Sequence, residues 1–343
     1  MLKKIKVQDA VGQRLSHDIT EIRPGEFKGA AFREGHTVCD EDICHLQKLG
    51  KNHLYLIDLE KDEIHENQAA SILADGLAGT GISWEDDPKE GKICLYAKRD
   101  GLLVINKANL AAFNMVDEVM CASLHSYTLV KKGQQVAATR AIPLVMKRNP
   151  VERAATIASQ GGGTVSVHSL KDAKVGVVIT GNEVFNGLID DKFAPILKKK
   201  INDLGSHITS IEFAPDNVQL IQKAIEKHIA NNCDLILLSG GMSVDPDDVT
   251  RKGIQNAGAT EMHYGAAALP GAMFMVAYIN GIPLLGVPAC GLHHKVTVLD
   301  LVLPRILIGE QIGKKELAFI GHGGLCMDCP ECTHPHCPFG KGM

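Results

Sequence analysis

The sequence predicts an α/β protein with a doubly wound, mostly parallel sheet in its second half. After residue 170, short apolar segments rich in Val, Ile and Leu alternate with longer amphipathic segments. This alternation is typical of parallel strands that are covered by helices on both faces. A β-rich α+β region precedes this part, and four cysteines gather within the last eighteen residues. We therefore expect a first region over 1–165, in one or two subdomains, an α/β domain over 170–312 and a cysteine-rich tail over 313–343.

The elements of the α/β domain are expected in a regular order. Nearly continuous apolar runs predict strands, and longer segments with a periodic apolar face predict helices. Pro304 should kink the last helix because proline cannot donate a backbone hydrogen bond. The expected strands are 174–180, 207–213, 234–239 and 283–287, and the expected helices are 194–205, 217–232, about 246–256 and 295–309.

The first region has a different pattern, in which short strands alternate with turns that contain glycine. Strands are expected at 53–59, 92–98 and 101–105, and short helices at 41–50 and 67–77. The segment 127–146 resembles a β-hairpin whose turn is Lys132-Gly133.

Composition excludes some classes of protein. The 343 residues are 45% hydrophobic and 22% charged, with a formal net charge of -4, so there is no basic surplus of the kind that binds nucleic acid. No apolar run is long enough to span a membrane, and the start, MLKKIKVQDA, lacks the apolar core of a signal peptide. We therefore expect a cytoplasmic protein with a small-molecule ligand and neither a nucleic-acid nor a membrane partner.

The segment LLSGGMSVDPDDVT, residues 237–250, follows an expected buried strand. In an open parallel sheet, ligands bind beyond the carboxyl ends of the strands. Two glycines allow a sharp turn with accessible backbone N–H groups, and Asp245 and Pro246 suit the start of a helix, where an anion is stabilised. Asp247 and Asp248 then have two explanations: they complement the helix dipole, or they contact a metal ion or a donor group of the ligand.

Other expected strand ends carry similar residues. Polar residues follow the first strand in TGNE, at residues 180–183, and Asp191 and Asp216 come after the first and second strands. Asp216 has an alternative role as the N-cap of the next helix. Pro/Gly turns occur at 269–273 and 287–291. We expect these loops to converge on one rim of the sheet.

These motifs carry a resemblance to a known family. TGNEVFNGLIDD, FAPDN, SGGMSVDPDDVT, LPGAMF and VPACG resemble, in order and spacing, the molybdopterin-binding domain of molybdopterin molybdotransferases of the MoeA and gephyrin-E type. The resemblance covers residues 174–310 and, through KVQDAVGQRLSHDIT and GAAFREGHTVCDEDICHLQKLG, also the start of the chain to about residue 57.

The resemblance implies a site for molybdopterin or its adenylylate, with Mg²⁺ and molybdate. It implies that Glu183, Asp191, Asp216 and Asp248 are the catalytic residues, which hold Mg²⁺, molybdate or the polar edge of the substrate. The candidate cofactor-binding residues are Thr180, Gly181, Asn182, Ser239, Gly240, Gly241, Met242, Ser243, Asp245, Asp247, Pro270, Gly271 and Pro288.

The sequence also departs from the family. Asn182 stands where the family usually has Asp, and Leu269 and Ala272 replace two lysines of a K-P-G-K-P turn. Residues 58–165 lack the usual motifs of the family's second domain. Binding of the cofactor survives these changes better than catalysis does. We therefore keep three functions open: assistance of Mg²⁺-dependent molybdate insertion in cofactor biosynthesis, a non-catalytic carrier or sensor of the cofactor, and a nucleotide pyrophosphatase of the competence-damage-protein type. Relatives suggest a homodimer, and a molybdenum enzyme is the expected recipient of the product.

The tail has the spacing of a metal-ligand set. Its thiols, C-x2-C-x2-C-x4-C, have a last gap one residue longer than that of the ferredoxin motif, so Zn²⁺ and an iron–sulfur cluster both remain open. Transient binding of molybdenum or copper, or a tail of free thiols, are the alternatives. The expected metal ligands are Cys326, Cys329, Cys332 and Cys337.

Overall fold

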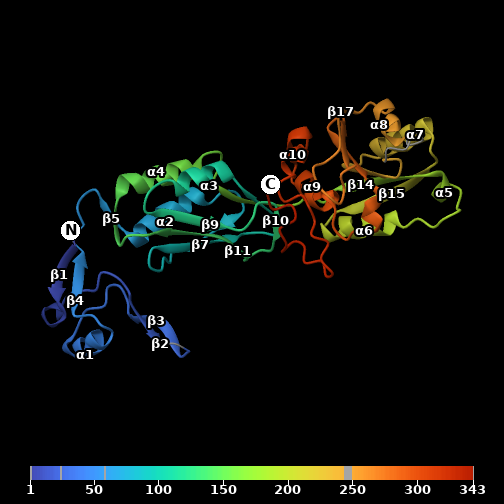
Figure 1. Ribbon diagram of the computed structural model, residues 1–343. Helices are drawn as coiled ribbons and strands as arrows, with labels where there is room; N and C mark the ends of the chain where they lie inside the picture. Colours follow the sequence, from blue (N-terminus) through green and yellow to red (C-terminus); the bar gives the residue numbers. More distant parts are fainter. Residues whose placement is uncertain (1, 24, 58, 243–248, 343) are drawn as a thin grey trace. The chain divides into compact units, whose positions relative to one another are not determined.

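The computed structural model describes residues 2–23, 25–57, 59–242 and 249–342 (Figure 1). The chain divides into two compact units. The first unit contains residues 1–98, 105–124 and 132–166, and the second contains 99–104, 125–131 and 167–343. No helix in the described part of the chain combines the length and the apolar character needed to cross a lipid bilayer.

The first unit begins with two small antiparallel strand pairs. Strand β1 (Leu2–Lys6) pairs with β4 (His53–Ile57), and β2 (Ile19–Arg23) pairs with β3 (Phe27–Phe32). A short 3-10 helix, η1 (Val7–Ala10), and helix α1 (Asp40–Lys48) complete this part. Its buried core contains Val7, Ala10, Leu15, Ile19, Phe32, Val38, Leu46 and Leu54.

The rest of the first unit combines antiparallel strands with three helices. One sheet has the order β6-β7-β11-β9, and β5 pairs with β12. The strands are β5 (Glu63–His65), β6 (Ile82–Ser83), β7 (Lys92–Ala97), β9 (Val119–Ser123), β11 (Gln135–Ala141) and β12 (Val145–Lys147). The helices are α2 (Glu66–Leu77), α3 (Lys107–Asn114) and α4 (Arg148–Ser159).

The expected hairpin over 127–146 is wrong. Strand β10 (Thr128–Val130) pairs with β8 (Gly101–Ile105) in a three-stranded sheet that β13 (Val165–His168) completes. Strand β11 instead pairs with β7 and β9. Lys132-Gly133 therefore connects strands of two different sheets, because each strand finds its partners elsewhere in the chain.

The second unit is built on a six-stranded sheet with the order β15-β14-β16-β19-β18-β17. The first four strands in this order are parallel, and β18 and β17 are antiparallel to their neighbours. The prediction of a mixed α/β domain is confirmed. The strands are β14 (Lys174–Thr180), β15 (His207–Ala214), β16 (Leu235–Ser239), β17 (Thr260–Tyr264), β18 (Met275–Ile279) and β19 (Ile282–Val287).

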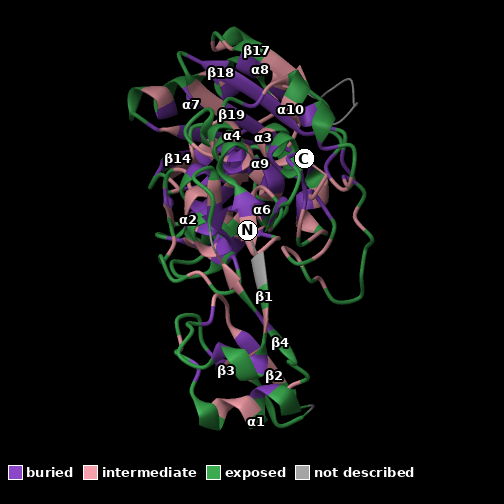
Figure 2. Ribbon diagram, turned by 90° about the vertical axis from the view of Figure 1, so that its left-hand side faces the viewer, coloured by how far each residue is buried: buried purple, intermediate pink, exposed green. Residues whose placement is uncertain are grey.

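Helices cover both faces of this sheet. Successive residues of a strand point to opposite faces, so each strand places apolar side chains against the helices on both sides. On one face, Val177 and Leu237 pack with α6 (Phe193–Asp203), α9 (Val298–Leu307) and α10 (Lys314–Phe319). On the other, Val178 and Leu238 pack with α7 (Val218–Ala230) and α8 (Thr250–Asn256). Figure 2 shows the strands β18 and β19 in the buried colour.

The start of one helix differs from the sequence prediction. We expected a helix from about Pro246, with Asp247 and Asp248 in its first turn. Helix α8 begins at Thr250, and Asp247 and Asp248 lie outside the described residues. The Thr250 hydroxyl lies 3.0 Å from the Thr180 hydroxyl, which ties the first residue of the helix to the end of β14.

A fully buried histidine lies on α7. The Nε2 of His228 is 3.0 Å from the carbonyl oxygen of Val177, and its Nδ1 is 3.3 Å from the hydroxyl of Ser210. Because a carbonyl only accepts hydrogen bonds, Nε2 carries the proton and donates it, and Nδ1 accepts from Ser210. Burial lowers the pKa of His228 below its usual value of 6.5, so the ring is neutral at pH 7.

Candidate ligand cavity at the carboxyl ends of the strands

The parallel strands bring several predicted residues together at one edge of the sheet. The backbone N–H of Gly181 donates to the carbonyl oxygen of Ala214 over 3.1 Å, which joins the ends of β14 and β15. The hydroxyl of Thr180 donates to the carbonyl oxygen of Ser239 over 3.1 Å, which joins the ends of β14 and β16. The loops after these three strands therefore meet at one rim.

The double glycine after β16 is required by packing. Both residues have positive φ angles, 88° for Gly240 and 56° for Gly241, which favour glycine. A Cβ on Gly240 would lie 2.2 Å from the carbonyl oxygen of Thr180, and one on Gly241 would lie 2.2 Å from the hydroxyl oxygen of Thr250. The glycines thus allow the turn to pack against two threonines. We expected the glycines to give a ligand access to backbone N–H groups, and the contacts with Thr180 and Thr250 give a further, packing reason for glycine at both positions.

Two residues that the sequence reasoning missed stabilise the same turn. The Tyr264 hydroxyl donates to the carbonyl oxygen of Met242 over 2.8 Å. The guanidinium of Arg251 lies 4.4 Å from the centre of the Tyr264 ring, a cation–π contact. Arg251 thus places a positive charge beside Tyr264, the residue that contacts the turn. Tyr264 was missed because it ends β17, a strand that the sequence pattern did not indicate.

The hydroxyl of Ser239 is a buried polar group without a hydrogen bond among the described residues. Ser239 is fully buried, and its Oγ has no hydrogen-bond partner within the described part of the chain. A buried hydroxyl without a partner costs about 1–3 kcal/mol. Ser239 is a predicted cofactor-binding residue, but it is not among the residues that line the cavity beside this turn.

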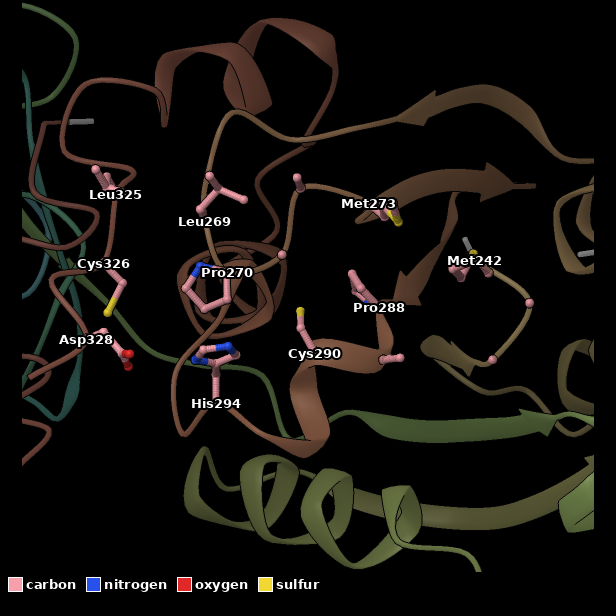
Figure 3. Close-up of a pocket in the computed structure, with 15 residues that line it drawn as sticks. Met242, Leu269, Pro270, Met273, Pro288, Cys290, His294, Leu325, Cys326 and Asp328 are labelled. Carbon is pink, nitrogen blue, oxygen red and sulfur yellow. The ribbon is translucent and has the colours of Figure 1, made fainter. Parts of the chain in front are cut away.

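A cavity of about 530 Å³ lies beside the turn, and we call it the first cavity (Figure 3). It is lined by residues 240–242, 269–273, 288–290, 294, 325, 326 and 328. Six of the predicted cofactor-binding residues line it, namely Gly240, Gly241, Met242, Pro270, Gly271 and Pro288. Figure 3 shows Leu325, Cys326 and Asp328 on one side of the cavity and Met242 and Met273 on the other.

The walls of the first cavity are mainly apolar side chains and backbone. Among its described lining residues, Asp328 carries the acidic group, His294 the imidazole, and Cys290 and Cys326 the thiols. Burial raises the pKa of the Cys290 thiol, so this group stays protonated at neutral pH and is a weak nucleophile.

Three of the predicted catalytic acids, Glu183, Asp191 and Asp216, do not line the first cavity. Asp191 accepts hydrogen bonds from the backbone N–H groups of Phe193 (2.8 Å) and Ala194 (3.0 Å), so it caps α6. Asp216 accepts from the backbone N–H of Asn182 over 3.0 Å and returns its own N–H to the Asn182 side chain over 3.1 Å. Glu183 is exposed on α5 (Asn182–Phe185).

Four further predicted site residues lie outside the described residues, namely Ser243, Asp245, Asp247 and Asp248. Within the described ranges, no group of three or more His, Cys, Asp or Glu side chains is arranged to hold a metal ion. The acidic Mg²⁺ site therefore stays a prediction.

The cysteine-rich tail forms one wall of the first cavity, which the sequence did not indicate. Backbone hydrogen bonds of 2.8 Å run from the N–H of Leu269 to Gly324 and from the N–H of Cys326 to Leu269, as in a short parallel strand pair. Further along, Phe339 is buried in the core of the second unit, only 3% exposed. These contacts attach the tail to the loop at 269–273.

A second cavity, of about 430 Å³, lies between residues 293–296 and the tail. It shares His294, Cys326 and Asp328 with the first cavity. All ten cysteines of the chain are free thiols. The four predicted metal ligands line this second cavity, namely Cys326, Cys329, Cys332 and Cys337.

Two family models match parts of this chain, and one of them contains most of the residues that line the first cavity. Residues 176–307 match the family model described as "Probable molybdopterin binding domain". This molybdopterin-binding domain match contains β14, β16 and β19, and with them the Gly240-Gly241, Pro270-Gly271 and Pro288 turns of the first cavity. Residues 4–58 match a second model, described as "Domain of unknown function (DUF8806)".

Similar proteins share only part of their length with this chain. A protein of Archaeoglobus fulgidus is 32% identical over 81 residues, which are 24% of this chain and 35% of that protein. A CinA-like protein of Fervidobacterium nodosum is 32% identical over 81 residues, which are 24% of this chain and 20% of that protein. The chain thus spans about a fifth to a third of the length of these relatives.

Solved structures show weak overall similarity. The molybdopterin biosynthesis enzyme MoaB of Thermus thermophilus has a TM-score of 0.34 and 17% identity, over 40% of this chain and 98% of that protein. The molybdopterin biosynthesis protein MoeA of Pyrococcus horikoshii has a TM-score of 0.33 and 16% identity, over 90% of this chain and 75% of that protein. Similarity at this level establishes no function.

Proposed function

We propose that the second unit binds molybdopterin or its adenylylate in the first cavity and acts in molybdenum cofactor biosynthesis. One observation carries the proposal. Three turns that line the first cavity, Gly240-Gly241, Pro270-Gly271 and Pro288, all fall within the segment that matches the molybdopterin-binding domain model. The motif resemblance and the family match thus point to the same loops.

The size and chemistry of the first cavity support a ligand of this class. Its volume of about 530 Å³ lies within the range of small-molecule sites, about 300–1,000 Å³. Apolar walls suit the flat face of a pterin ring.

The described residues favour a binding or carrier role over Mg²⁺-dependent molybdate insertion. A hard dication needs several free oxygen ligands. Both carboxylate oxygens of Asp191 accept backbone N–H groups, and Asp216 is bonded to Asn182. The described donor set therefore does not fit Mg²⁺. Asp248 and its neighbours are the residues on which the insertion role depends.

A nucleotide pyrophosphatase is the second candidate function. It is favoured by the CinA-like relatives, which are 32% identical over 81 residues. It predicts hydrolysis of a nucleotide phosphoanhydride with no preference for a pterin.

The decisive experiment incubates the purified full chain with adenylylated molybdopterin, Mg²⁺ and molybdate, and follows both pterin binding and release of AMP. Binding without AMP release supports the carrier, and AMP release that requires molybdate supports insertion. Hydrolysis of simple dinucleotides without pterin binding supports the pyrophosphatase. Failure to bind the pterin contradicts the main proposal.

A matched pair of variants locates the binding site. Ala272 lines the first cavity and is exposed, so Ala272→Trp should fill the cavity and abolish pterin binding. Ala230 is an exposed residue at the end of α7, outside the cavity lining, so Ala230→Trp should leave binding unchanged. Equal affinities of the two variants would show that the pterin binds elsewhere.

We also propose that the tail cysteines hold Zn²⁺ or an iron–sulfur cluster, as their spacing predicts. Their place on the second cavity supports this proposal.

A further inference from the structure

We propose that the second cavity is a site for one thiophilic divalent ion of the Zn²⁺ class, held by the four tail thiols, and that this ion fixes the tail as a wall of the first cavity. The first part of the proposal stands on the tail alone. The second part, a coupling between metal and pterin, rests on the proposed function.

The placement of the thiols is the first argument. Cys326, Cys329, Cys332 and Cys337 all line a single cavity of about 430 Å³. Their segment has no helix, and the isolated bridge at Leu325 is its only described strand-like pairing. The thiols can therefore approach one another without breaking a regular element.

The anchoring of the loop is the second argument. At one end, the N–H of Cys326 donates to the carbonyl oxygen of Leu269 over 2.8 Å. At the other end, Phe339 is buried in the core, and the N–H of Gly340 donates to the carbonyl oxygen of Gly323 over 2.9 Å. The fold has therefore already closed the loop that carries the thiols, which removes much of the entropy cost of gathering them.

In the structure described here, no three ligand side chains of the described residues are close enough together to hold an ion. Metal binding must therefore draw the thiols inward. The chemistry is a ligand exchange without oxidation: each coordinating thiol releases one proton to solvent, and the aqueous ion loses its water ligands as four sulfur–metal bonds form.

The spacing favours a single ion over a cluster. A last gap of four residues fits the Cys-x2–4-Cys spacing of structural zinc sites, whereas the ferredoxin motif has three. Four thiolates around one tetrahedral ion satisfy Zn²⁺ fully, so the site is closed and structural in character.

The shared wall is the basis of the coupling. Cys326, Asp328 and His294 line both cavities. An ion that holds Cys326 also holds the backbone pairing with Leu269, which is part of the first cavity. By linkage, an ion that stabilises this wall raises pterin affinity, and the pterin raises metal affinity by the same factor.

The metal site is tested on the reduced full chain by titration with Co²⁺, followed by displacement with Zn²⁺. We expect one equivalent of Co²⁺ with a thiolate-to-cobalt charge-transfer band and the absorption of a tetrahedral ion. The double variant Cys329→Ser, Cys332→Ser should lose both bands. Cys44→Ser is the control, because Cys44 is an exposed thiol on α1.

Three results would overturn the metal site. The first is an absence of thiolate-to-cobalt absorption, and the second is the same absorption in the double variant. The third is an iron–sulfur spectrum in anaerobically purified protein that takes up no Co²⁺.

The coupling is tested separately by measuring molybdopterin affinity with and without Zn²⁺. We expect Zn²⁺ to tighten binding about 5-fold or more, the usual lower range of coupling between sites, and to have no such effect on the double variant. Unchanged affinity refutes the coupling. A protein that binds Zn²⁺ but no molybdopterin supports the metal site and contradicts the proposed function, so the two failures are distinguishable.

Discussion

The substitution Gly240→Ala tests whether packing at the rim of the sheet determines the glycine turn. Gly240 has a φ of 88°, and a Cβ there would lie 2.2 Å from the carbonyl oxygen of Thr180. The left-handed backbone costs about 1–2 kcal/mol for a residue other than glycine. Forcing the added methyl group against a packed backbone costs a further ~1–3 kcal/mol. We expect the variant to lose about 2–5 kcal/mol of unfolding free energy.

Gly258→Ala is the matched control. Gly258 has a nearly equal φ of 93°, but a Cβ there meets no atom within 4 Å. This variant should lose only the free energy that the left-handed backbone costs, about 1–2 kcal/mol. The difference between the two variants therefore isolates the contact with Thr180.

The assay is urea unfolding of the full chain followed by far-ultraviolet circular dichroism. The single tryptophan, Trp84, lies in the first unit, so its fluorescence reports on that unit, while circular dichroism also reports on the second. We expect the lower unfolding free energy to appear in the circular dichroism transition. We also expect Gly240→Ala to lose molybdopterin binding. Equal destabilisation by both substitutions would refute the packing argument.

Four further predictions follow from individual contacts. Because burial lowers the pKa of His228, the unfolded chain binds a proton at this residue more readily than the folded chain. Stability should therefore fall as the pH drops below 6.5, by up to about 1.4 kcal/mol per pH unit. Urea unfolding at several pH values should show a less steep fall in His228→Gln. Tyr264→Phe removes the donor to the Met242 carbonyl and should cost about 1 kcal/mol in the same assay. Phe339→Ala should cost about 3–5 kcal/mol and expose the tail to proteolysis, whereas alanine at Met327, which is 70% exposed, should change stability by less than about 0.5 kcal/mol. Asp191→Asn should keep pterin binding if the carboxylate only caps α6, and should lower stability by about 1 kcal/mol, because Asn has one acceptor oxygen in place of the two that Asp191 uses.

Two of these predictions have a contrary result that would identify a different cause. A pH profile of His228→Gln that matches the wild type would mean that another group titrates. Loss of pterin binding in a stable Asp191→Asn protein would show that its charge, and not its capping, is required.

Strands buried on both faces were predictable because their residues are uniformly apolar. The expected strand at 174–180 coincides with β14, and the one at 234–239 overlaps β16 almost completely. The strand β18 is equally buried but was missed, although Asn280-Gly281 after it is a two-residue turn of the kind that joins antiparallel strands. The edge strand β17, TEMHY, has little apolar pattern and gave no signal.

The loops of the first cavity were predictable for a topological reason, since parallel strands end at one edge. Its tail wall was not. The pairing between Leu269 and Leu325 uses backbone groups only, and such contacts leave no mark in side-chain identity. Asp191 shows the opposite limit, because a carboxylate just before a helix has the same sequence signature whether it caps the helix or binds a metal.

The pairing of the tail with the loop at Leu269 also has a consequence for synthesis. The last strand of the sheet ends at Val287, but the wall depends on the burial of Phe339 much later in the chain. All strands of the six-stranded sheet are therefore synthesised before the tail residues that form one wall of the first cavity.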